Sequence, residues 1–315
     1  MRSILPVLSF ALLLLAPSLG SAKSLNGFEL DNASVPLDLV QSGGPPRDGI
    51  PALTDPKFEL GKNAKSVKAR DVVLGLMING EAKAYPLNIL NWHEIVNDTV
   101  GGKRVVVSYC PLCSSGMAFS SKPEGSGKRE LEFGVSGLLY SSDVLMYDRE
   151  TESLWSQIHG EAVAGALVGS KLKQIPMSLS RWSTWLQRNP ETQVLSTETG
   201  YRRDYQRDPY AGYAKHPSIY FPVANQAPSQ YHQKEMVLGV LLGDSAVAFP
   251  FSELEKQDKV SFEYVVGNQI YTIHWDSQNQ SAWVTDKDGQ ALASTLLFWF
   301  AWYAFYPDTQ VFNAS

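Results

Sequence analysis

The stretch Val72–Leu87, V-V-L-G-L-M-I-N-G-E-A-K-A-Y-P-L, decides the fold because it is typical of a β-hairpin and then recurs. Two apolar runs flank Asn79-Gly80, which is a strong signal for a two-residue hairpin turn. The segment Met236–Phe251 aligns to this stretch without gaps. The positions of identity in the second copy are Val237, Leu238, Gly239, Ala246, Ala248 and Pro250.

A second match follows the first in the same order along the chain. It predicts two related β-meander lobes, each followed by a short aromatic helix, and therefore a mainly β (α+β) fold. We expect the second of these helices at Leu296–Phe305, as a buried aromatic helix that is too short to span a membrane. The match pairs Trp182, Trp185, Pro190, Thr192, Gln193 and Val194 with Trp299, Trp302, Pro307, Thr309, Gln310 and Val311.

The regions between the repeats suggest a division of the chain. The turn-rich run Gly43–Pro51 predicts little regular structure near the N-terminus, and a Tyr- and Pro-rich run separates the lobes. We predict a signal peptide at 1–22, an irregular wrapping segment at 23–70, a first lobe with the cysteine site at 71–199, a linker at 200–234 and a second, structural lobe at 235–315.

The N-terminus has the pattern of an export signal. Arg2 precedes the apolar run Leu5–Ala16, and small residues allow cleavage after Ala22. The run is shorter than the roughly 20 apolar residues that a membrane span needs. We therefore expect a periplasmic or secreted protein without a transmembrane span in the mature chain.

The charge balance limits the classes of partner. The 315 residues carry a net charge of −5 with a pI near 5.6, and no basic stripe is present. This argues against nucleic acid and against an anionic membrane surface. The expected partner is a small molecule or another exported protein, which the sequence does not identify.

The chemistry is concentrated in Val105–Met117, V-V-V-S-Y-C-P-L-C-S-S-G-M, which holds the only two cysteines of the chain. Cys110, Cys113 and Met117 offer sulfur ligands, and His93 lies one predicted strand away. Thiolate, thioether and imidazole together favour copper. The leading hypothesis is an exported copper-binding protein with Cys110 as anchor. A redox-active form of this hypothesis has the metal carry electrons.

Two alternatives stay open. A Cys-Pro-Leu-Cys pair in an oxidising compartment also suits a thiol–disulfide oxidoreductase, with Cys110 as nucleophile and Cys113 as resolving thiol. The third reading is a non-catalytic binding module that uses the aromatic linker. Acidic residues beside Val144–Tyr147, among them Asp143 and Asp148, are interpreted as turn residues. Glu94 and Asp98 are candidates to orient His93.

Several motifs resemble domain-of-unknown-function family 3179. The resemblance covers nearly the whole mature chain, and it implies a larger role for Cys110 than for Cys113. The motifs are D-G-I-P-A-L at Asp48–Leu53, N-G-E-A-K-A-Y-P at Asn79–Pro86, W-H-E-I-V-N-D at Trp92–Asp98, Y-C-P-L-C at Tyr109–Cys113, F-G-V-S-G-L-L at Phe133–Leu139 and M-Y-D-R at Met146–Arg149.

Overall fold

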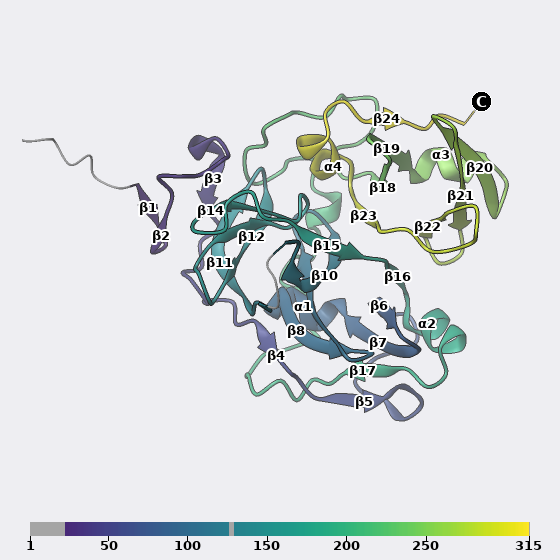
Figure 1. The fold of residues 1–315 in the computed structure, drawn as a ribbon. Coiled ribbons are helices and arrows are strands. Elements are labelled where there is room, and N and C mark those ends of the chain that lie inside the picture. The colour runs from purple at the N-terminus through teal and green to yellow at the C-terminus, as the bar shows by residue number, and fades with distance from the viewer. Residues whose placement is uncertain (1–22, 126–128, 315) are drawn as a thin grey trace, which may run out of the picture.

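The computed structural model describes residues 23–125 and 129–314. The predicted signal peptide at 1–22 lies outside these residues. The described chain is mainly β with few, short helices, which confirms the predicted class. Five larger sheets are arranged as a five-bladed, propeller-like ring (Figure 1), so the two repeated units are two of five sheets. The predicted domain boundaries stay predictions.

The sequence repeat corresponds to two sheets with the same strand order. In both, an antiparallel hairpin pairs on one side with a long-range antiparallel strand and on the other with a short parallel strand. The first sheet has the order β16 (Met177–Arg181), β6 (Val72–Ile78), β7 (Glu81–Pro86), β17 (Gln193–Leu195) and β5 (Phe58–Leu60); the second has β23 (Ser294–Phe298), β18 (Met236–Leu242), β19 (Ser245–Pro250) and β24 (Gln310–Val311).

A glycine–tryptophan contact holds each repeat together. A Cβ placed on Gly75 would lie 2.3 Å from the Trp185 ring, and one on Gly239 would lie 2.3 Å from the Trp302 ring. Each indole N–H then donates to the threonine of its own repeat at 2.8 Å. The same packing of a tryptophan against a glycine therefore occurs in both repeats.

The cysteine-bearing sheet and its neighbour fill the space between the repeats, and a three-stranded sheet completes the ring (Figure 1). The cysteine-bearing sheet has the order β15 (Leu172–Ile175), β10 (Ser115–Pro123), β9 (Lys103–Cys110), β8 (Ile95–Val100) and β4 (Leu53–Thr54). Its neighbour has the order β14 (Glu161–Ala164), β13 (Leu154–Ser156), β12 (Asp143–Asp148), β11 (Phe133–Tyr140) and β3 (Val40–Ser42). The three-stranded sheet has β20 (Ser261–Val266), β21 (Gln269–Asp276) and β22 (Ser281–Thr285), and a separate pair is formed by β1 (Ser24–Leu25) and β2 (Phe28–Glu29).

The α-helices are short, with six or seven residues each, and each follows a strand. Pro86 and Pro250 end the two repeated hairpins and stand at the N-caps of α1 and α3. The aromatic helix expected at Leu296–Phe305 begins later, because Leu296–Phe298 belongs to β23. The helices are α1 (Leu87–His93), α2 (Trp182–Arg188), α3 (Phe251–Lys256) and α4 (Trp299–Phe305), with 3-10 turns at Leu37–Leu39, Gly61–Asn63 and Tyr213–Lys215.

The wrapping segment 23–70 is less irregular than predicted. Its strands β3, β4 and β5 each add an edge to a different sheet by pairing with β11, β8 and β17. No period-2 pattern marks these strands in the sequence, because each contributes only two or three residues. The segment ties three sheets of the ring together.

Candidate functional site

The two cysteines lie on a four-residue turn between neighbouring strands. β9 ends at Cys110, β10 begins at Ser115, and these two residues are paired across the hairpin. The Cys113 backbone N–H donates to the Cys110 carbonyl at 3.2 Å, which closes the turn. Ser114 completes it in the left-handed region with φ 54°. Both sulfurs are therefore held on the same side of one turn.

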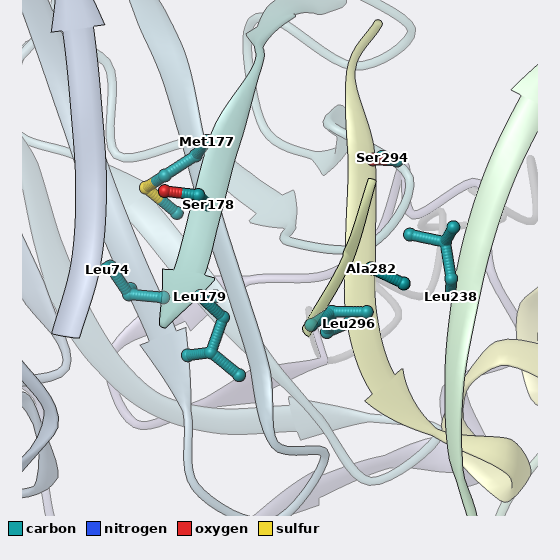
Figure 2. Close-up of a pocket in the computed structure, with 9 residues that line it drawn as sticks. Leu74, Met177, Ser178, Leu179, Leu238, Ala282, Ser294 and Leu296 are labelled. Carbon is teal, nitrogen blue, oxygen red and sulfur yellow. The ribbon is translucent and has the colours of Figure 1, made fainter. Parts of the chain in front are cut away.

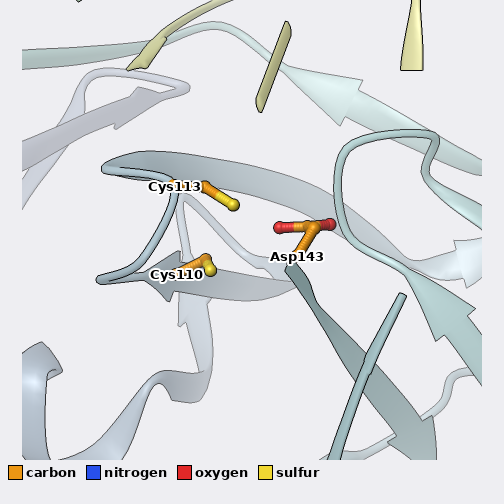
Figure 3. Close-up of side chains that lie close together, drawn as sticks. All are labelled: Cys110, Cys113 and Asp143. Atoms are coloured by element: carbon orange, nitrogen blue, oxygen red, sulfur yellow. The ribbon is translucent and has the colours of Figure 1, made fainter. Parts of the chain in front are cut away.

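A third residue, Asp143, brings a carboxylate to the sulfurs (Figure 3). Asp143 begins β12, directly after the Ser141-Ser142 turn, whose φ angles are 51° and 65°. One ligand atom from each of Cys110, Cys113 and Asp143 lies within 4.8 Å of the other two. The Cys113 sulfur also lies 3.3 Å from the Ser142 carbonyl. The turn was predicted as ordinary, so the sequence missed Asp143 as a site residue.

The three residues of the site are buried, and this changes their acid–base chemistry. Cys110 is 1% exposed, Cys113 0% and Asp143 1%. Burial raises the pKa of Asp143 to about 7, although the Ile158 N–H that donates to Oδ2 opposes the shift. Burial also raises the pKa of the Cys113 thiol. Oδ1 of Asp143 has no hydrogen-bond partner among the described residues.

The structure does not bring His93 into this group. Its Nδ1 lies 2.7 Å from the Pro51 carbonyl and its Nε2 lies 2.7 Å from the Tyr205 hydroxyl. Both ring nitrogens are thus already engaged, and burial lowers the pKa of His93. His93 therefore connects the end of α1 to Pro51 and to Tyr205 of the linker, and does not offer a free nitrogen to a metal.

Met117 belongs to the same buried apolar cluster as the two cysteines. It lies on β10 and lines a cavity of about 280 Å³ together with Ile158, Trp302 and Tyr306. Ser115 pairs with Cys110, and Met117 follows Ser115 by two residues, so its side chain is on the same face as Cys110 but farther along the strand. The cysteines and carboxylate that the structure groups are Cys110, Cys113 and Asp143, without His93.

Glu94 reaches the cysteine site from the end of α1, where it was expected only to orient His93. It lines a cavity of about 90 Å³ together with Cys110 and Tyr210. The Glu94 backbone is left-handed, with φ 57°, and the side chain is buried. Burial raises the pKa of this carboxyl to about 8, and nearby Asp143 adds to the shift. Glu94 is therefore protonated at neutral pH.

Residues of the linker and of the second repeat cover the site through hydrogen bonds. The Ser142 hydroxyl donates to the Phe221 carbonyl at 2.7 Å, and the Ala224 N–H donates to the Ser141 hydroxyl at 3.0 Å. The Phe298 N–H at the end of β23 donates to the Cys113 carbonyl at 2.9 Å. The second repeat, predicted as a scaffold, thus also positions the cysteine turn.

The junction of four sheets is not a second site. The cavity there measures about 10 Å³, which is room for about one water molecule. Figure 2 shows it lined mainly by apolar side chains, among them Leu74, Leu179, Leu238 and Leu296. No titratable residue lines it. Tight packing at this junction stabilises the ring and leaves the chemistry to the cysteine turn.

Comparison with known proteins identifies the family. The family model described as "Protein of unknown function (DUF3179)" matches residues 47–309. The chain belongs to the DUF3179 family. No curated protein and no solved structure matches it. The DUF3179 match includes both repeats and the whole cysteine site. Along the described residues, no helix has the length and apolar character needed to cross a membrane.

Proposed function

We propose that this DUF3179 protein is an exported metal-binding protein that holds a thiophilic transition-metal ion, copper(I) first, on Cys110, Cys113 and Asp143. The observation that carries the proposal is the mutual distance of at most 4.8 Å between the two sulfurs and the carboxylate oxygen. Two atoms that each bond one ion at about 2.3 Å lie at most about 4.6 Å apart, so a group of this size needs only a small inward shift of its side chains to bind an ion.

The donor set favours a soft ion. Two thiolates select copper(I) or zinc over magnesium and calcium. Two thiolates and one carboxylate are three protein ligands, which leave one position of a four-coordinate ion open to an external ligand, as in catalytic zinc sites. The Asp143 carboxyl interacts with both cysteine side chains, so a bound ion would take the place of the thiol protons between the sulfurs and the carboxylate.

Export supports the same proposal. The N-terminal pattern with cleavage after Ala22 sends the chain out of the cytoplasm. In an oxidising compartment two free neighbouring thiols are stable only if something protects them. Burial and a bound soft ion both provide that protection, so the location and the site are consistent.

Thiol–disulfide exchange is a second candidate, and Asp143 is the observation that favours it. A carboxyl with a pKa of about 7 can accept the thiol proton at neutral pH. The Cys110 thiolate would attack a substrate disulfide and expel one thiolate; Cys113 would then resolve the mixed disulfide and leave the substrate reduced by two electrons. The burial of both sulfurs disfavours protein disulfides as substrates.

Metal titration tests the proposal. The purified mature protein, stripped with a chelator, is titrated without oxygen with copper(I) and separately with zinc, in competition with an indicator. We expect one ion per chain, with thiolate-to-metal absorption. Cys110→Ser and Cys113→Ser should abolish binding, and Asp143→Asn should weaken it by at least about tenfold.

Two matched variants separate this ligand set from the one predicted from the sequence. Met117→Leu removes a sulfur while nearly keeping side-chain volume, and His93→Gln removes the imidazole. Both should keep full affinity if the protein remains folded. Binding that depends on Met117 but not on Asp143 contradicts the proposal. Absence of binding together with a trapped mixed disulfide in Cys113→Ser would favour the second candidate.

A further inference from the structure

The cavity beside Cys110 has the features of a ligand pocket. It measures about 90 Å³, and its deep wall holds Glu94, Cys110 and Val144. Residues of the wrapping segment and the linker, including Ile50 and Tyr210, form the partly exposed side. By the room that a water molecule needs, the cavity holds on the order of six waters or one small organic molecule.

Glu94 is the unexplained group in this cavity. Its side chain makes no hydrogen bond or ion pair with any residue of 23–125 or 129–314, although the residue is only 7% exposed. Its backbone is held at φ 57°, a conformation that disfavours every residue with a side chain. A buried, unpartnered polar group on a strained backbone is unfavourable for folding alone, and such features gather at functional sites.

We propose that this cavity is the ligand pocket of the cysteine site, and that it takes a small uncharged molecule whose hydrogen-bonding group contacts Glu94 while the molecule lies against the Cys110 sulfur. The inference rests on the proposed function only because that function places the chemistry at Cys110.

The chemistry of the wall selects the ligand class. Among the described residues, no lysine or arginine lines the cavity, so nothing in its wall would compensate the charge of an anion. The remaining wall is apolar, with Val135, Leu138 and Leu139 beside Val144, so a charged ligand would lose its hydration without compensation. The Glu94 carboxyl, which has no partner in the described protein, can form a hydrogen bond with an amide group of a neutral ligand.

Alkylation of the metal-free protein tests the pocket without depending on metal affinity. Iodoacetamide is small and uncharged, and iodoacetate is its anionic counterpart; each forms a sulfur–carbon bond and releases iodide and the thiol proton. Peptide mass mapping gives separate rates for the two cysteines. We expect iodoacetamide to modify Cys110 faster than Cys113, and faster than iodoacetate modifies Cys110.

Variants locate the effect in the pocket. Glu94→Leu should slow iodoacetamide at Cys110 about fivefold, the worth of one hydrogen bond, while Glu94→Gln should keep the rate. Ile50→Trp should block the reaction by filling the partly exposed side. Leu39→Trp is the matched control, since Leu39 is also partly buried against the same core but does not line the cavity.

The outcomes are distinguishable from those of the metal titration. Equal, slow labelling of both cysteines, or an unchanged Cys110 rate in Ile50→Trp, would overturn the pocket even if copper binds with full affinity. Preferential labelling of Cys110 in a protein that binds no metal would keep the pocket and remove the metal. Thermal unfolding of each variant confirms that a slower rate does not come from a changed fold.

Discussion

Trp185 lies flat against Gly75, so closely that a Cβ on the glycine would be 2.3 Å from the ring. Gly75→Ala must therefore push the indole away from the hairpin. We expect a loss of about 3 kcal/mol in the free energy of unfolding, the upper end for overpacking a core. Denaturant unfolding measures it.

The second repeat provides a replicate of this experiment. Gly239→Ala should cost a similar amount, because Trp302 lies 2.3 Å from the corresponding position. Gly43→Ala is the control, since its nearest neighbour would be 3.4 Å away. Trp185→Leu should recover part of the loss in the Gly75→Ala background; strictly additive effects would contradict the packing argument.

The pair formed by His93 and Tyr205 predicts a dependence of stability on acid. Burial lowers the pKa of His93 below its ordinary value of 6.5. Below pH 6.5 the unfolded chain therefore takes up a proton that the folded chain resists, so stability falls as the pH drops towards the folded pKa. His93→Gln should lose this component. Denaturant unfolding between pH 5 and pH 8, compared between the two proteins, checks the sign.

Tyr205→Phe tests the same pair from the linker. It leaves His93 Nε2 buried without its 2.7 Å partner, at a cost of about 1–3 kcal/mol. Hydrogen exchange should then show faster opening around Tyr205 than in the wild type. An unchanged exchange rate would mean that the linker is held by its other contacts alone.

The buried ion pair between Lys83 and Asp98 predicts a large loss on breaking it. Lys83 Nζ lies 3.0 Å from both carboxylate oxygens, and the Tyr85 hydroxyl donates to Oδ2 at 2.8 Å. Asp98→Asn leaves the buried ammonium with only the more distant and more exposed Glu81 carboxylate, at 3.7 Å, and should cost about 3 kcal/mol. Glu198→Gln is the matched control, because its pair with Lys57 is 73% exposed on both sides. Equal effects of the two variants on unfolding would contradict this account.

Glu94 predicts a pH dependence of opposite sign to that of His93. Its pKa rises from 4.5 to about 8 on folding, so the folded chain binds the extra proton between these values. Stability relative to Glu94→Gln should therefore fall as the pH rises from about 4.5 to 8 and level off above it. Asp143 shifts in the same direction but is present in both proteins, so the difference reports Glu94. A flat difference would show that Glu94 is solvated.

The repeat and the mainly β class could be predicted from the sequence because they depend on local periods. The Asn79-Gly80 turn and the spacing between Trp185 and Thr192 are both local features of the sequence. The structure contains the hairpin at this turn and the hydrogen bond from Trp185 to Thr192. The start of α4 was misplaced because Leu296–Phe298 is apolar in either a strand or a helix, and only pairing with β18 makes it a strand.

The two cysteines of the site could be predicted from the sequence, but its two carboxyl groups could not. Cys110 and Cys113 are neighbours on one turn, so their spacing along the chain settles their proximity. His93 offered the right ligand type, but its bonds to Pro51 and Tyr205 engage both ring nitrogens. Asp143 and Glu94 carried no local signal, since an acidic residue at a turn or a helix end is ordinary in sequence.

The sequence by itself determined the repeated hairpins, the cysteine turn and the family of this protein, because each is encoded in a short continuous stretch. Only the tertiary structure decided which groups share the space around the sulfurs. Asp143 reaches Cys113 from a different sheet, and the linker seals both from water, so the pKa values that define the chemistry depend on burial that no local pattern encodes.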